Sequence, residues 1–222
     1  SGRYGKLIPI ATAAAVYAGG VDSTESFLCQ LVHEGTDPQK LVPLARYDIE
    51  RHYDPLSVRE IGVVTVRHGA FLESTHAEHF DATLFRMSPT EALHMDPQQR
   101  LLLETCLRTC AVANLLSLEV KISSIRERTG VYVGCMYNEV PHLQREYGVD
   151  AGAYAGTGSG SAFMCGRMSY CLDLSGPCIS TDTACSSSLV STHLAWREVG
   201  MREAQAPQHC RPLLLRPFGP MS

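Results

Sequence analysis

One cysteine stands in a sequence context that favours nucleophilic chemistry. The run Cys178–Asp182 is β-prone, small residues follow it, and a helical pattern begins at Leu189. Cys185 therefore falls at a strand-to-helix turn, where the first free N–H groups and the positive end of the helix favour a thiolate. The same donors can hold the oxyanion of a tetrahedral intermediate. A nucleophile at a strand-to-helix turn beside such donors is the arrangement called a nucleophile elbow. A buried structural cysteine before a serine-capped helix would give the same local pattern.

The other cysteines carry no comparable signal. The chain has nine cysteines and no Cys-x-x-Cys pair. Cys106 and Cys110 stand four apart and share a helix face, but no histidine or second pair completes a metal site, so no metal site is predicted. Most of the nine lie among apolar or small residues and are interpreted as buried hydrophobes. This usage favours a reducing compartment, cytoplasmic or plastid, over a disulfide scaffold.

Composition excludes several classes of partner. The 222 residues are 45% hydrophobic and 19% charged, with a net charge of −4. No basic surface for nucleic acid or anionic lipid is expected from this balance. The apolar stretch Leu7–Ala18 contains Pro9 and is interpreted as a buried first strand rather than a signal-peptide core. No other stretch approaches the length of a membrane span. Proteins or small molecules are the expected partners.

Helix starts and stops can be located from capping residues. Ser23 is predicted to cap a helix with an apolar face from Phe27 to Val32, closed by Gly35. Ser88–Glu91 reads as a capping box with proline at the first helical position. Asp96–Gln99 shows the same order of capping residue and proline and starts a helix with a stronger apolar pattern. Two helices are therefore expected to meet at a sharp corner.

Short strands alternate with these helices. Gly130–Gly134 and Cys178–Asp182 are the clearest strand candidates, and the mixture predicts an α/β fold. Gly156–Ser161 is predicted to be a small-residue loop that allows close backbone approach. It lacks the spacing of a phosphate-binding loop. We predict one domain over residues 1–200 and an irregular, Pro-rich tail over 201–222.

Two long motifs stand out in the sequence, at Asp182–Leu189 and at Met95–Glu104. Both resemble motifs of ketosynthase (β-ketoacyl synthase) domains of type I modular polyketide synthases. Asp182–Leu189, Asp-Thr-Ala-Cys-Ser-Ser-Ser-Leu, is similar to the family's active-site signature, also seen in animal fatty acid synthase. Met95–Glu104 is similar to a second signature. Shorter resemblances follow in the family's order at Gly19–Ser23, Tyr53–Pro55, Phe80–Asp81, Gly130–Gly134 and Gly166–Tyr170. The resemblance covers about residues 19–199, the family's N-terminal portion.

The resemblance implies a thiolase-like layered fold, helix/sheet/helix/sheet/helix in the intact family, with this chain supplying the N-terminal half. It implies that Cys185 takes an acyl chain from an acyl carrier protein and that a malonyl-type carrier thioester then condenses with it by decarboxylation. No cofactor-binding residue or metal is implied, because the phosphopantetheine arm belongs to the carrier protein. A homodimer through the strand before Cys185 is also implied.

In the family, the reaction uses two histidines from the second half of the ketosynthase domain. No residue of this sequence matches either of them. Only His193 and His209 follow Cys185, and neither stands in a family motif. His193 is eight residues on, roughly 12 Å along a helix, too far to reach the sulfur, and is interpreted as a packed helix residue. We therefore expect a truncated ketosynthase that cannot condense alone.

Two alternatives remain from the sequence. The first is a catalytically dead remnant that acts only as a dimerisation or carrier-protein-binding module. The second is a stand-alone cysteine acyltransferase or thioesterase that uses another base. The absent histidines favour the remnant, whereas retention of Cys185 favours descent from an active enzyme.

Overall fold

The computed structural model describes residues 24–57, 61–72, 78–112, 129–150, 152–205 and 212–215, which belong to two compact units. The described residues of the larger unit lie between Glu78 and Pro220, and those of the smaller unit between Ala15 and Ala77. The expected first strand and the Gly19–Ser23 motif lie outside the described residues. None of the described helices has the length and apolar character needed to cross a membrane.

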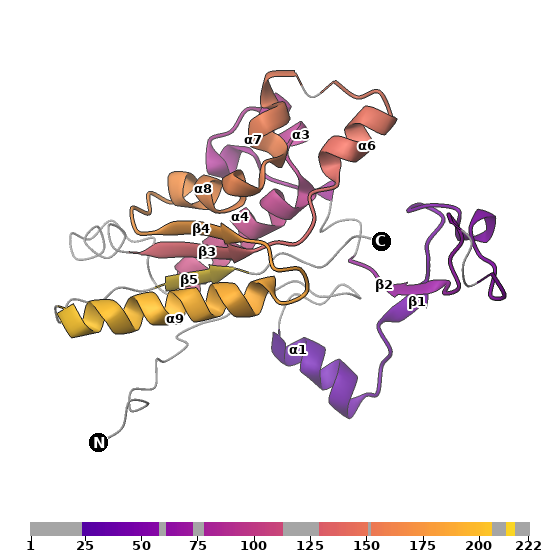
Figure 1. The fold of residues 1–222 in the computed structure, drawn as a ribbon, viewed down its shortest axis with the longest axis horizontal. Helices are drawn as coiled ribbons and strands as arrows, with labels where there is room; N and C mark the ends of the chain where they lie inside the picture. The colour runs from indigo at the N-terminus through magenta and orange to yellow at the C-terminus, as the bar shows by residue number, and fades with distance from the viewer. Residues whose placement is uncertain are drawn as a thin grey trace. The chain divides into compact units, whose positions relative to one another are not determined.

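The larger unit is built on a parallel sheet with the strand order β4-β3-β5. The strands are β3 (Gly130–Gly134), β4 (Cys178–Thr181) and β5 (Pro212–Leu215). In register, Val131 lies opposite Cys178 on one side and Leu213 on the other. All five residues of β3 are buried, because β3 is the central strand and has helices on both faces (Figure 1). Both predicted strands are confirmed, with β4 ending one residue early.

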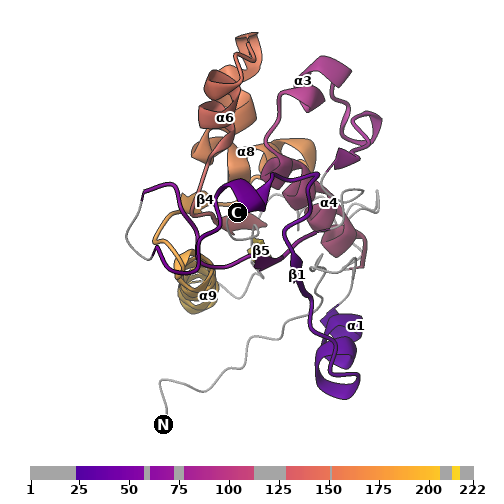
Figure 2. The ribbon, with the colours of Figure 1, turned by 90° about the vertical axis from the view of Figure 1, so that its right-hand side faces the viewer.

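Helices cover the two faces of this sheet. On one face lies α9 (Ser187–Gln205), and on the other lie α8 (Ser161–Cys171) and α4 (Pro97–Val112). The side view in Figure 2 shows the same division, with α9 seen nearly end-on. The described part of the larger unit is therefore a helix/sheet/helix sandwich, as the predicted α/β class requires.

The core lies between β3 and the helices α4 and α8. Its largest fully buried apolar side chains come from all three elements and from the corner just before α4: Met95, Leu103, Cys106, Val131, Val133, Met164 and Met168. The predicted apolar residues of α4, Leu101–Leu103 and Cys106, are all buried. Cys106 and Cys110 share the buried face of α4, as their spacing predicts.

The predicted caps form the corner before α4. In α3 (Pro89–Leu93) the Ser88 Oγ accepts a hydrogen bond from the Glu91 N–H at 3.1 Å. At α4 the Asp96 Oδ1 accepts from the Gln98 N–H at 2.7 Å. The capping box is incomplete in one respect, because the Glu91 carboxylate pairs with the Arg167 guanidinium on α8.

The glycine-rich segment before α8 is helical, so its prediction as a loop is wrong. Residues Ala155–Ser159 form α7. The expected close approach is confirmed, since a Cβ at Gly158 would lie 2.3 Å from the His94 carbonyl oxygen. The Gly158 carbonyl also accepts a hydrogen bond from the Asp96 N–H at 2.8 Å. The short helix fits here because glycine lets its backbone touch the α3–α4 corner.

The prediction of an irregular tail is also wrong for those residues of 201–222 that the structure describes. Helix α9 continues past Gly200 to Gln205, and Pro212–Leu215 forms β5. A glycine in a helix costs only about 1 kcal/mol relative to alanine, which the packing of α9 on the sheet can offset. The other residues of 201–222 lie outside the described part.

The smaller unit contains α1 (Thr24–Leu28), a π-helical turn at Cys29–His33 and the antiparallel pair β1 (Gln39–Leu41) and β2 (His68–Ala70). Gly35, the predicted helix stop, has φ of +64°. The predicted apolar face is largely exposed, and the predicted cap Ser23 lies outside the described residues. The remaining described elements of the chain are α6 (Val140–Glu146) and single turns at Ile49–Arg51, Thr83–Phe85 and Gly152–Tyr154.

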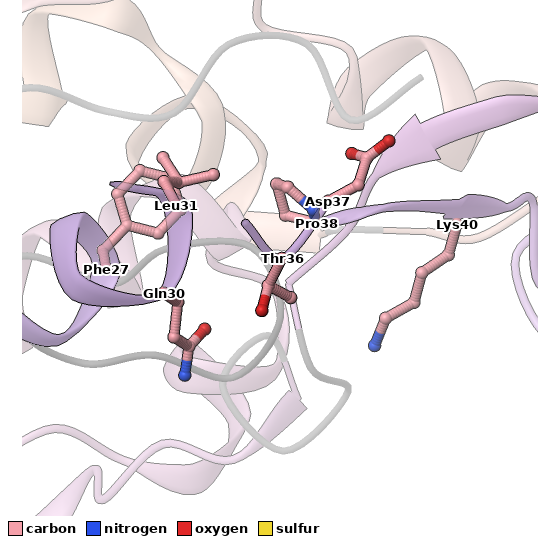
Figure 3. A pocket seen from close by; sticks show the side chains of 7 residues that line it. All are labelled: Phe27, Gln30, Leu31, Thr36, Asp37, Pro38 and Lys40. Carbon is pink, nitrogen blue, oxygen red and sulfur yellow. The ribbon is translucent and has the colours of Figure 1, made fainter. Parts of the chain in front are cut away.

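A small hollow lies between the helical segment and β1 of this unit (Figure 3). Phe27 and Leu31 line it from the helical side, and Pro38 faces them. Its volume of about 150 Å³ is well below that of ordinary ligand pockets. None of its lining residues belongs to the Cys185 turn.

Gly134 sets how closely β3 and α9 pack. A Cβ at this position would lie 2.5 Å from the Ser187 carbonyl carbon and 2.5 Å from the Ser188 nitrogen. These are backbone atoms and cannot rotate aside. We expect Gly134→Ala to lower the free energy of unfolding by about 1–3 kcal/mol, measured by urea unfolding.

The matched control is Gly200→Ala, in α9, where no atom lies within 4 Å of the added Cβ. That variant should be more stable by roughly 0.5–1 kcal/mol, because alanine loses less backbone entropy in a helix. Equal effects of the two substitutions would show that the close approach at Gly134 has no energetic consequence.

Candidate active site

Cys185 lies in the five-residue turn between the end of β4 at Thr181 and the start of α9 at Ser187. Its side chain is exposed. The predicted strand-to-helix position is therefore confirmed. The alternative of a buried structural cysteine is wrong, because Cys185 and the other residues of the turn are exposed and Cys185 is not part of the core cluster.

The backbone before the sulfur has an uncommon conformation. Ala184 has φ of +54°, in the left-handed region that L-residues other than Asn and Asp seldom occupy. Its N–H donates to the Asp182 Oδ1 at 3.0 Å, and the Ser186 Oγ donates to the Thr183 carbonyl at 2.7 Å. Local side-chain hydrogen bonds thus stabilise the turn that presents Cys185.

A buried hydroxyl connects the two ends of this turn. The Ser187 side chain is only 4% exposed, and its Oγ accepts from the Thr183 N–H at 2.9 Å and donates to the Ala184 carbonyl at 2.6 Å. Behind it, the hydroxyls of Thr181 and Ser191 lie 2.6 Å apart. The sequence analysis treated Ser186–Ser188 only as helix caps and did not predict that the Ser187 hydroxyl would bind both Thr183 and Ala184. The signal available was the run of three serines immediately after Cys185.

A second cysteine lies beside the turn but is not poised to react. Cys135 follows β3, and its N–H donates to the Thr181 carbonyl at 3.0 Å. Its Sγ lies 3.5 Å from the Gln98 Oε1 and is buried. Burial raises the pKa of this thiol to about 11, and the carboxylates of Asp96 and Asp182 add to the rise. At neutral pH Cys135 is therefore a protonated, sheltered thiol.

His193 was expected to lie too far from Cys185 to take part, and its position on α9 agrees with this. His193 lies about two turns further along α9, where it is exposed and its ring centroid is 5.9 Å from that of Trp196. It is therefore not the packed residue that was expected. His209 lies outside the described residues. Among the described His, Cys, Asp and Glu side chains, no group of three could hold a metal ion.

The sequence matches the model of the β-ketoacyl synthase N-terminal domain over residues 7–206. The chain belongs to the β-ketoacyl synthase family, and the matched part is that family's N-terminal domain. The match extends beyond the Cys185 turn through the end of α9.

Curated relatives are polyketide synthases. Polyketide synthase GfsB of Streptomyces halstedii is 41% identical over 180 residues, which are 81% of this chain and 3% of GfsB. The pikromycin polyketide synthase component PikAII of Streptomyces venezuelae is 41% identical over 189 residues, 85% of this chain and 5% of PikAII. The chain thus spans a few per cent of the length of these relatives.

Solved ketosynthase domains share the fold. The oxazolomycin ketosynthase domain OzmH KS7 of Streptomyces albus JA3453 aligns with a TM-score of 0.73 and 34% identity, covering 87% of this chain and 32% of that domain. The ketosynthase from module 6 of the bacillaene synthase of Bacillus subtilis 168 aligns with a TM-score of 0.62 and 29% identity, covering 87% of this chain and 29% of the other. The expected thiolase-like fold of the N-terminal part is confirmed.

Proposed function

We propose that this chain carries the acyl-accepting part of a polyketide ketosynthase, with Cys185 as the nucleophile. The observation that supports this most directly is the exposed sulfur at the turn between β4 and α9, in a chain of the β-ketoacyl synthase family. A thiol in this position is accessible to a long thioester arm, whereas the buried thiols of the described core are not.

The proposed first step is a transthioesterification. The Cys185 sulfur attacks the carbonyl carbon of an acyl thioester on an acyl carrier protein. A new C–S bond forms to Cys185 as the C–S bond to the carrier's phosphopantetheine breaks, and the proton of the Cys185 thiol ends on the departing pantetheine sulfur. The enzyme needs no cofactor of its own for this exchange. Backbone N–H groups at the turn and the start of α9 are the candidates for stabilising the oxyanion, apart from those of Ser186 and Ser187, which already donate to the Thr183 and Ala184 carbonyls at 3.3 and 3.0 Å.

The second step, which the resemblance implies for the intact family, is decarboxylative condensation. A malonyl-type thioester on a carrier protein loses carbon dioxide, and its carbanion attacks the acyl-Cys185 carbonyl. This releases the Cys185 thiolate and leaves a β-ketoacyl thioester on the carrier. The histidines that the resemblance implies for this step match no position of the 222 residues, so we assign acyl transfer and not condensation to this chain.

The test is to incubate the purified chain with an acyl thioester of an acyl carrier protein and to follow its intact mass. We expect the mass of one acyl group to be added per chain, with one equivalent of free carrier thiol released. A chain that folds and yet gains no acyl group would contradict the proposal. It would favour the alternative in which the chain acts only by binding a carrier or a second copy.

We further propose that the chain self-associates through β4. This strand is at the edge of the described sheet, and its first residue and Ile179 are exposed, Ile179 at 37%. An exposed edge strand offers unpaired backbone groups to a second copy. We expect sedimentation at micromolar concentration to show dimers or larger species, weakened in Ile179→Lys. A compact monomer for the unmodified chain would contradict this.

A further inference from the structure

We propose that Ser187 is the positioning residue of the Cys185 nucleophile, and that it acts through its hydroxyl without contacting the substrate. The inference rests on the proposed acyl transfer to Cys185. It follows from where the Ser187 side chain lies, what holds it there and which backbone groups it binds.

The Ser187 hydroxyl spans the residues that precede the nucleophile. All five residues between β4 and α9 are exposed, whereas Ser187 is 4% exposed. Its Oγ accepts from the Thr183 N–H at 2.9 Å and donates to the Ala184 carbonyl at 2.6 Å. Because Cys185 lies between Ala184 and Ser187 in the chain, this bridge fixes the backbone on both sides of the sulfur-bearing residue.

Ser187 is itself fixed by the sheet. Gly134 at the end of β3 leaves no room for a Cβ against the Ser187 carbonyl carbon, which it would meet at 2.5 Å. From β4, the Thr181 Oγ1 donates to the Ser187 carbonyl at 3.3 Å. Both neighbouring strands therefore hold the Ser187 peptide, and the Ser187 hydroxyl transmits that position to the turn.

The bridge matters because Ala184 is in the left-handed region, with φ of +54°. An alanine leaves this conformation readily unless its surroundings hold it there. Ser187→Ala keeps the bond from the Ser187 N–H to the Ala184 carbonyl, at 3.0 Å, but removes the hydroxyl's bonds to both Thr183 and Ala184. With that bridge gone, the turn can relax and move the sulfur relative to the N–H groups that would stabilise the oxyanion. Such a displacement of about 1 Å can cost on the order of 10²-fold in rate. Attack on a small alkylating reagent needs no oxyanion site, so it should be affected much less.

The experiment compares two reactions of Cys185 in Ser187→Ala. We expect the maximal rate of acylation by an acyl-carrier thioester to fall by about 10- to 100-fold, with the half-saturating thioester concentration within about twofold of the unmodified chain. The rate of Cys185 alkylation by iodoacetamide should change by less than about threefold. The matched control is Thr192→Ala, an exposed hydroxyl on the same helix that donates to the Ser188 carbonyl at 2.7 Å, and it should leave both rates unchanged.

Unchanged acylation in a folded Ser187→Ala chain would overturn the proposal. A parallel loss of acylation and alkylation would also overturn it, because that result indicates general loss of structure. If Ser187→Ala does not fold by circular dichroism, Ser187→Thr decides. It keeps the hydroxyl and should acylate within about threefold of the unmodified chain, and a tenfold loss in folded protein would contradict the proposal. Absence of acylation in the unmodified chain would instead refute the proposed function and leave the alkylation comparison intact.

Discussion

Replacing Cys185 by alanine is expected to reduce acyl transfer to the chain by on the order of 10³-fold or more, since the substitution removes the attacking atom and leaves the fold in place. Cys185 is exposed and outside the core cluster, so Cys185→Ala should unfold at the same denaturant concentration as the unmodified chain. The rate is measured as the gain of one acyl mass from an acyl-carrier thioester.

The matched controls for this prediction are Cys178→Ala and Cys29→Ala. Both cysteines are exposed, one at the start of β4 and one in the smaller unit. Neither lies in the turn, so both variants should keep the acylation rate. If Cys178→Ala lost acylation and Cys185→Ala kept it, the acceptor would be the strand cysteine.

Replacing Arg167 by methionine is expected to lower the free energy of unfolding by about 3–5 kcal/mol, because it leaves the partly buried Glu91 carboxylate and the Gln99 Oε1 without their arginine donor. The Arg167 side chain is 9% exposed and pairs with Glu91 on α3. It also donates to the Gln99 Oε1 at 2.9 Å and to the Thr157 carbonyl at 3.1 Å. One guanidinium therefore connects four helices around the α3–α4 corner.

The control is Arg108→Met on α4, where the arginine is exposed and the change should cost less than about 1 kcal/mol. Urea unfolding of both variants gives the comparison. If Arg167→Met unfolded within 1 kcal/mol of Arg108→Met, the buried network would have no special role in stability. Such a result would also show that Glu91 is sufficiently solvated without its partner.

Local sequence signals predicted the elements whose causes are local. The caps at Ser88 and Asp96 form as expected because each needs only a side chain and an N–H two or three residues away. Strand β3 was identified by its β-branched and aromatic run between glycines. The Cys185 turn was found for the same reason, since the end of one pattern and the start of the next lie close together in the chain.

The features that were missed depend on partners distant in the sequence. Glu91 was interpreted as the second half of a capping box, but it binds Arg167, 76 residues later. Gly158 looks like a loop residue until the His94 carbonyl is placed against it. Ser187 reads as one of three equivalent serines, and its burial against Gly134 of β3 and its bonds to the turn distinguish it. Each of these roles is set by tertiary packing, which spacing along the chain does not reveal.

The core thiols compete weakly for an acyl group. Burial raises the pKa of the thiols of both Cys135 and Cys165 to about 11, and it also raises the pKa of the Cys106 thiol well above its ordinary value. At pH 7.5 only about one in several thousand Cys135 or Cys165 side chains would be thiolate, and the core restricts access to them. Among the described cysteines, the exposed competitors of Cys185 are Cys29 and Cys178.

The most direct test of the central claim is a peptide mass map of the folded chain after brief exposure to a limiting amount of acyl-carrier thioester at pH 7.5. We predict that the acyl group is found on the peptide containing Cys185, with Cys29 and Cys178 unmodified and the core cysteines modified only after unfolding. An acyl group found mainly on Cys29, Cys178 or a core cysteine of the folded protein would contradict the assignment of Cys185 as the nucleophile.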